Sequence, residues 1–161
     1  MHKLLEIMQR LVELHEELIQ LSQSKTEEIK RGDVDQLSKL LMQERQQVQL
    51  ITQKETERHE IVEKLFNEQQ VTDKEYTMTN VLAHAEDGSE KEQLEIVMSK
   101  LINVIIELRN VEKLNNDLMV QSMQFVQLSL DLLQPSLSRM NYDNKKHSQA
   151  SFDQSVFDSK A

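Results

Sequence analysis

The chain has 161 residues, of which 38% are apolar and 29% charged, and its net charge at pH 7 is −9. It contains two glycines, one proline and no cysteine. All-β and βα-repeat folds need turn residues about every 8–12 positions, so both classes are excluded and long helices remain. The missing cysteines exclude disulfides and thiolate metal sites, and the acidic balance argues against nucleic-acid binding.

The N-terminal part of the chain has the clearest apolar periodicity. Apolar triplets recur at a spacing of seven residues from Leu4 to Leu21, which predicts a helix over 2–31 with one wide apolar face. Gly32 suits a left-handed helix end and Asp33 suits the N-cap of the next helix. We therefore expect a tight helical hairpin at this point.

A second helix is expected over 34–69, and charged residues interrupt its apolar stripe. The interruptions are Glu44, Glu55 and Arg58. We interpret them as a thinly covered part of the helix, with Glu55 and Arg58 paired at i,i+3 spacing, in preference to a buried polar site.

The remaining pattern predicts a short helical insert near 73–84 and a third long helix over 90–134 that Pro135 ends. The fold class is therefore all-α, an elongated antiparallel bundle of three long helices. Residues 1–134 are expected to form the helical bundle domain. The polar residues 135–161 are expected to form a flexible tail with an amphipathic end segment.

No motif in the sequence indicates catalysis. Glu55, His59 and Glu63 share a helix face, but a solvated face explains them better than a metal site. Two glycines cannot build a phosphate-binding loop, and the paired carboxylates have no apolar pocket to perturb them. We expect no enzyme, catalytic residue, metal or cofactor. No signal peptide and no membrane-inserting segment is visible, so a cytoplasmic protein is expected.

The third predicted helix is longer and more apolar than its partners can cover. At 1.5 Å per residue it spans about 67 Å, against about 45 and 54 Å for the first two. The overhanging apolar surface needs another chain, a partner helix or the tail as cover. Phe152 and Val156 lie one turn apart in the tail, which is then either part of a partner site or a self-docking placeholder.

Four parts of the chain resemble the FlgN-type flagellar export chaperones. They are the hairpin at 29–33, the second-helix pattern of Leu37, Leu40, Glu44, Glu55 and Arg58, the Asn-rich run at 114–123 and the closing residues 157–161. Glu112 stands where the resemblance suggests a second Asn. The resemblance implies a cytoplasmic type III export chaperone that holds the C-terminal amphipathic segment of hook-associated proteins, prevents premature assembly and delivers them for export.

In this family the end of the third helix and the tail carry client binding. Carried onto this sequence, the client-binding residues are Leu118, Met119, Met123, Val126, Leu130, Leu133, Phe152 and Phe157. Val156 joins them through its spacing from Phe152, and Tyr142 is the candidate for export-gate contact. A structural coiled-coil homodimer, another homo-oligomer and a regulatory sequestering protein stay open as alternatives.

Overall fold

The computed structural model describes residues 1–68, 77–85 and 88–156, and the side chains of 1–67, 77–83, 85 and 88–133. The described residues are almost entirely helical and contain no strand, so the all-α class is confirmed. The chain divides into two compact units, Met1–Leu118 and Met119–Ala161, called unit 1 and unit 2 below.

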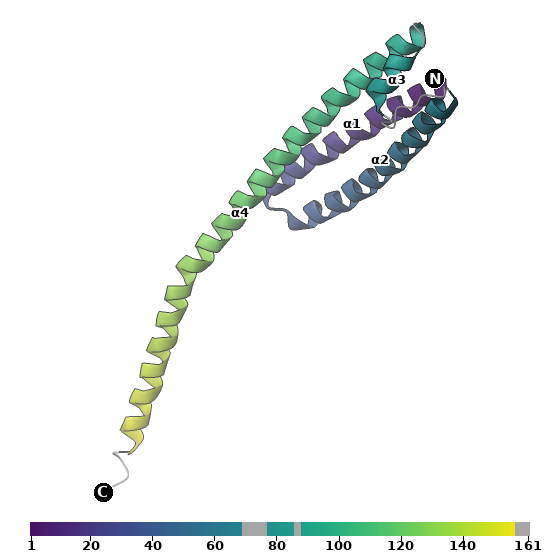
Figure 1. Cartoon of the computed structure of the whole chain (residues 1–161). Coiled ribbons are helices and arrows are strands. Elements are labelled where there is room, and N and C mark those ends of the chain that lie inside the picture. The colour runs from purple at the N-terminus through teal and green to yellow at the C-terminus, as the bar shows by residue number, and fades with distance from the viewer. Residues whose placement is uncertain (69–76, 86–87, 157–161) are drawn as a thin grey trace. The chain divides into compact units, whose positions relative to one another are not determined.

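The predicted helical hairpin is confirmed (Figure 1). Helix α1 spans His2–Arg31 and ends at Gly32, whose φ of 72° is left-handed. The Gly32 and Asp33 amides donate to the Ile29 and Glu28 carbonyls, which satisfies the helix end. The Asp33 carboxylate accepts the Gln36 amide at 3.0 Å and thereby caps the next helix.

Three further helices follow the hairpin. Helix α2 spans Val34–Glu68, and the prediction of 34–69 agrees with it over the described residues. Helix α3 spans only Met78–His84, where the Thr77 hydroxyl accepts the Asn80 amide. The short helix predicted near 73–84 is present over Met78–His84, Thr77 precedes it as the N-cap, and residues 73–76 lie outside the described residues.

Helix α4 spans Ser89–Val156, so the prediction that Pro135 ends the third helix at 134 is wrong. A proline inside a helix removes one hydrogen bond, here the one to the carbonyl four residues earlier, at Asp131. Water can satisfy such a carbonyl where the backbone is exposed. Residues 136–156 contain no glycine and no second proline, so nothing stops the helix from resuming.

All four helices of unit 1 contribute to one apolar core. Its buried residues are Leu4, Leu5, Ile7, Met8, Leu11, Val12 and Ile19 of α1, Val62 and Phe66 of α2, Val81 of α3, and Leu94, Leu101 and Val104 of α4. Each large apolar side chain stabilises the fold by about 1.5–3 kcal/mol when fully buried. The seven-residue pattern of α1 thus predicted the densest part of the core.

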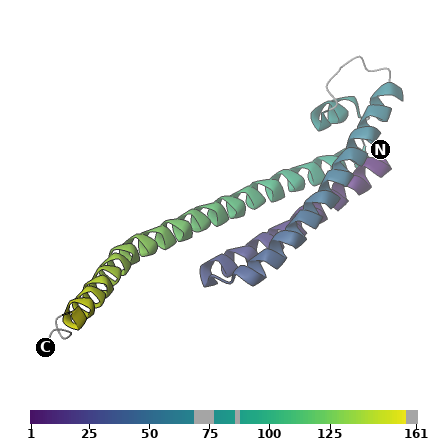
Figure 2. The same cartoon turned by 90° about the horizontal axis from the view of Figure 1, so that it is seen from below.

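Polar contacts give the helix directions within unit 1 (Figure 2). Lys25 pairs with Glu44 and the Leu14 carbonyl accepts from Gln47, so α1 and α2 are antiparallel. Helix α1 contacts the first part of α4 through the Glu16–Lys100 pair and, further along both helices, through the Thr26–Asn115 hydrogen bond. Residue numbers rise together on the two helices, so α1 and this part of α4 are parallel.

Two predictions about the architecture of the whole chain, the three-helix bundle and the division into domain and tail, are not tested by the structure. The contacts above fix helix directions inside unit 1 only, so an elongated antiparallel bundle of three long helices is not established for the chain. The division into a bundle of residues 1–134 and a flexible tail of 135–161 is likewise untested. The backbone of 135–156 continues α4.

Candidate functional site

The stretch of α4 from Met119 to Leu133 exposes an unusual number of large apolar side chains. Only one residue in this stretch is charged, Asp131, whose carboxylate accepts from the Gln127 amide at 2.9 Å. An uncharged helix with exposed apolar side chains is typical of a surface that another protein covers.

Five of the predicted client-binding residues form one continuous stripe on α4. They are Met119, Met123, Val126, Leu130 and Leu133, called the first apolar face below. Their spacing alternates four and three residues, which keeps them on one side of the helix. All five are exposed, Met123 at 70%.

The structure does not place the other predicted site residues on the first apolar face. Leu118 is half-buried and is the last residue of unit 1, so it is not placed with the stripe. Tyr142, Phe152 and Val156 lie on the helical backbone of α4, but their side chains lie outside the described residues. Phe157 lies outside the described residues altogether. Their roles in client binding and gate contact stay predictions.

A second group of exposed apolar residues was not assigned to the site by the sequence. Phe125, Leu128 and Leu132 are exposed at 71%, 58% and 70%. At 3.6 residues per turn they lie on the side of α4 roughly opposite the first apolar face. We call them the second apolar face. Their i, i+3, i+7 spacing is the signal that could have identified them.

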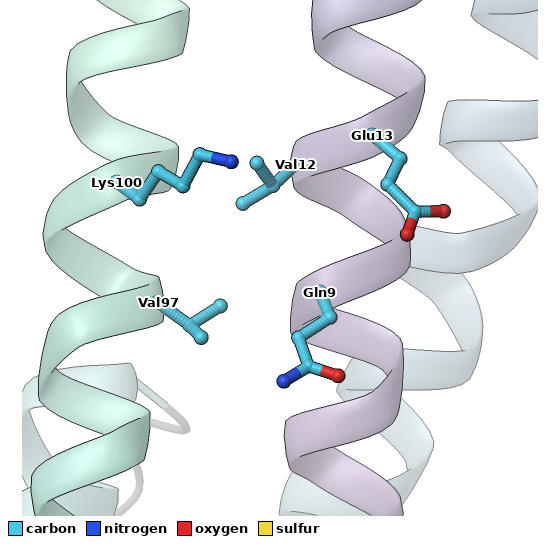
Figure 3. Close-up of a pocket in the computed structure, with 5 residues that line it drawn as sticks. All are labelled: Gln9, Val12, Glu13, Val97 and Lys100. Atoms are coloured by element: carbon cyan, nitrogen blue, oxygen red, sulfur yellow. The ribbon is translucent and has the colours of Figure 1, made fainter.

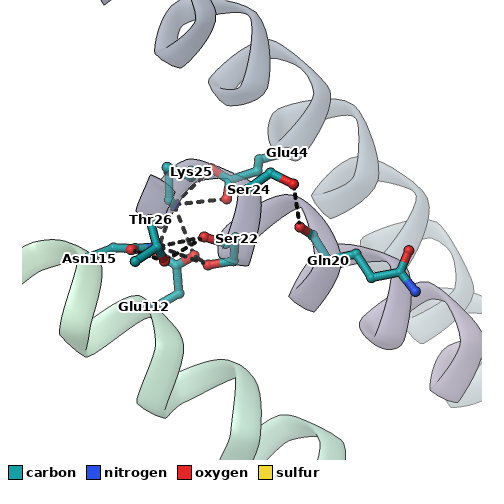
Figure 4. A network of polar contacts seen from close by, with 8 residues as sticks. All are labelled: Gln20, Ser22, Ser24, Lys25, Thr26, Glu44, Glu112 and Asn115. Atoms are coloured by element: carbon teal, nitrogen blue, oxygen red, sulfur yellow. Dashed lines mark hydrogen bonds and ion pairs between the residues drawn. The ribbon is translucent and has the colours of Figure 1, made fainter. Parts of the chain in front are cut away.

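Unit 1 ends in a buried polar cluster between α1, α2 and α4 (Figure 4). The Lys25 ammonium lies 2.8 Å from a Glu44 carboxylate oxygen and 2.9 Å from one of Glu112. The Ser22 hydroxyl also donates to Glu112. Lys25 is 7% and Glu44 9% exposed, so the interpretation of Glu44 as part of a thinly covered stripe is wrong. One sequence shows the charged interruption but does not show its partner on α1.

Asn115 completes this cluster and is 2% exposed. Its amide donates to the Ser22 carbonyl at 2.9 Å, and its carbonyl oxygen accepts from the Thr26 hydroxyl at 2.5 Å. An asparagine that uses both ends of its amide on one neighbouring helix fixes the register of the two helices. This residue belongs to the Asn-rich run that carried the resemblance, and its described role is structural.

The charges of the cluster stabilise one another. Burial alone lowers the pKa of Lys25, but hydrogen bonds from its ammonium to Glu44 and Glu112 outweigh burial and raise the pKa. Lys25 therefore stays protonated at neutral pH. The predicted pairing of Glu55 with Arg58 is also confirmed, at 2.8 Å.

Two of the pockets that the described residues form lie in unit 1. The first, about 290 Å³, lies between α1 and α4 and is lined by Gln9, Val12, Glu13, Val97 and Lys100 (Figure 3). The Lys100 ammonium pairs with Glu16, which is not among the residues that line this pocket, at 2.9 Å. The second, about 380 Å³, is lined mainly by apolar side chains around the Glu55–Arg58 pair.

Metal-binding and membrane-spanning features are absent from the described part of the chain. No group of three or more His, Asp or Glu side chains there has a metal-holding arrangement. No described helix is both long enough and apolar enough to cross a membrane. The exposed apolar side chains of the Met119–Leu133 stretch are the described feature that suits the binding of another protein.

Comparisons with known proteins agree with this arrangement. Residues 1–150 match the family described as FlgN protein. A protein of Bacillus subtilis (strain 168), named uncharacterized protein YvyG, is 34% identical over 163 aligned positions, which cover 98% of this chain and 97% of that protein. No solved structure matches the chain. Because the family match covers nearly the whole chain, this protein belongs to the FlgN family of flagellar export chaperones.

Proposed function

We propose that this chaperone binds the C-terminal amphipathic segment of hook-associated proteins, the components of the hook–filament junction. It holds them in the cytoplasm, prevents premature assembly and delivers them for export. Membership of the FlgN family makes hook-associated proteins the expected kind of partner. The observation that carries the proposal is the first apolar face, which presents five exposed apolar side chains on a nearly uncharged helix.

The first apolar face has the form that an amphipathic helix recognises. Such a helix presents apolar anchors at i, i+3, i+4 and i+7, the same spacing that the face itself uses. Five side chains that each bury on the order of 100 Å² give a total near 1,000 Å² over both partners, below the roughly 1,200 Å² of a stable specific interface and in the range of transient complexes. An interface of that size is compatible with release at the export apparatus. Met119 and Met123 also adapt to more than one apolar partner.

Co-purification tests the client and the segment that is bound. The chaperone is mixed with a full-length hook-associated protein and with the same protein lacking its last roughly 40 residues, a helix of a few turns with its flanks. We expect the full-length protein to be retained and the truncated one to be lost. Retention of both contradicts the C-terminal mechanism, and retention of neither contradicts the chaperone function.

A pair of variants tests the first apolar face directly. Met123→Glu places a carboxylate among apolar contacts and is expected to weaken client binding at least tenfold, as loss of a central anchor does. Gln124→Glu adds the same charge one residue away, between the two apolar faces, and is the matched control. Equal affinities for the two variants contradict the proposed site.

The tail is tested by deletion of residues 150–161, which removes Phe152, Val156 and Phe157. If the tail is a self-docking placeholder, the deletion tightens client binding. If these residues belong to the client site, the deletion weakens it. Tyr142→Ala is expected to leave client binding unchanged and to lower export of the client, since its proposed contact is with the export gate.

Light scattering separates the chaperone from a structural homodimer. A salt-resistant dimer that covers the first apolar face before any client is added favours the structural alternative. A monomer that binds a hook-associated protein favours the proposal. Capture of a transcription or signalling factor on the same face, with no affinity for hook-associated proteins, favours the sequestering alternative.

A further inference from the structure

The second apolar face cannot be covered by the helix that covers the first. A packed helix contacts its neighbour along a stripe about 100° wide. Phe125, Leu128 and Leu132 lie roughly opposite the first apolar face and outside that stripe. Three exposed large apolar side chains within two turns of helix are costly to leave in water. They therefore indicate a second contact surface on the same stretch of α4.

Polar residues separate the two faces and leave each of them uncharged. Gln124, Gln127 and Asp131 lie along one side of the helix, and Ser122 and Ser129 along the other. The Ser129 hydroxyl donates to the Phe125 carbonyl of its own helix at 2.9 Å. Apart from Asp131, these residues are small or neutral, so the edges between the faces allow two helices to lie against α4 at the same time.

The area of the second apolar face decides between two occupants. In a pair of identical chains joined through this face, six side chains at on the order of 100 Å² each bury about 600 Å². That total is well below the roughly 1,200 Å² of a stable specific interface. A second copy of the chain therefore does not hold this face by itself.

A client that covers both faces reaches the required area. Five side chains on the first face and three on the second give about 800 Å² on this chain, or about 1,600 Å² over both partners. This is the standard size of a specific complex. If both helical segments belong to one client, the second docks at the high effective concentration that a short connection provides.

We propose that the client presents two connected amphipathic helical segments, one on each apolar face, so that residues 119–133 of α4 are held between them. This inference rests on the proposed chaperone function and specifies the form of its client. Met123 reports on the first face, Leu128 on the second and Gln124 on the polar edge. All three side chains are exposed, so charged variants disturb binding without disturbing a core.

The test measures the affinity of a hook-associated protein for Met123→Glu, Leu128→Glu and the control Gln124→Glu by titration calorimetry. Circular dichroism first confirms equal helical content. We expect both face variants to weaken binding at least tenfold, the control to change it less than twofold, and one client to bind per chain. Two peptides that divide the client's C-terminal segment should each respond to only one of the face variants.

The possible outcomes separate the inference from the function on which it rests. If Met123→Glu weakens binding and Leu128→Glu does not, the site is one-sided: the inference fails and the chaperone function stands. If neither variant weakens binding, the inference and the proposed site on the first apolar face both fail, and the chaperone function, which the bound client still supports, stands. If sedimentation shows that Leu128→Glu dissociates a dimer while client affinity is unchanged, a second copy covers the face. Two clients per chain also overturn the inference.

Discussion

At the scale of single residues, Lys25 is the group whose loss should cost most. Its ammonium compensates two carboxylates, and Glu44 is buried with it. Lys25→Met leaves Glu44 as an uncompensated buried charge, which typically costs about 3–5 kcal/mol of unfolding free energy. Urea denaturation measures this loss. Lys54→Met is the matched control, because the Lys54–Glu57 pair is exposed and should cost under about 1 kcal/mol. Equal losses of unfolding free energy in Lys25→Met and Lys54→Met contradict the stabilising role of the buried polar cluster.

The same cluster predicts a dependence of stability on pH. The pKa of Lys25 in the folded chain lies above its ordinary value of 10.5. A group whose pKa rises on folding stabilises the protein below its unfolded pKa, and this contribution is lost as pH rises through the folded pKa. The wild type should therefore lose more stability above pH 10.5 than Lys25→Met does. Denaturation at pH 8 and pH 11 checks this, and parallel losses in the two proteins contradict it.

At the scale of elements, Gly32 is what makes the α1–α2 hairpin tight. Its φ is 72°, and a Cβ added there meets no atom within 4 Å. Gly32→Ala should therefore cost about 1 kcal/mol through backbone strain alone. Gly88→Ala is the control, since Gly88 has equal space and no positive φ. Chemical denaturation compares them, and a neutral Gly32→Ala contradicts this account of the turn.

Periodicity and turn chemistry account for what the sequence predicted at this scale. The triplets of α1 and the Gly32–Asp33 pair are local signals, and both predicted the observed hairpin. Pro135 is also a local signal, yet the single hydrogen bond it removes did not stop α4. Glu44 could not be interpreted locally, because its partners lie on other helices. The residues of the first apolar face were predicted through the family resemblance, whereas the second face was not assigned to the site although its i, i+3, i+7 spacing is visible in the sequence.

At the scale of the whole molecule, the net charge and the densest run of exposed apolar side chains, between Met119 and Leu133, lie in different parts of the chain. Residues 119–161 contain four acidic and four basic residues, so the net charge of −9 lies on residues 1–118. Among the residues whose side chains the structure describes, the buried apolar core lies in unit 1, at or before Val104. The acidic unit keeps the protein dispersed, while the uncharged stretch of α4 is left to bind apolar partners.

This separation predicts the behaviour of a chain shortened to Met1–Leu118. The deletion removes none of the buried core residues that the structure describes, so urea unfolding should stay cooperative and lose only about 1 kcal/mol of free energy. The Asn115 contacts with α1 are also kept, since they lie within unit 1. Calorimetry should nevertheless detect no binding of a hook-associated protein. Loss of cooperative unfolding would show that residues 119–161 support the core, and retained binding would place the client site in unit 1.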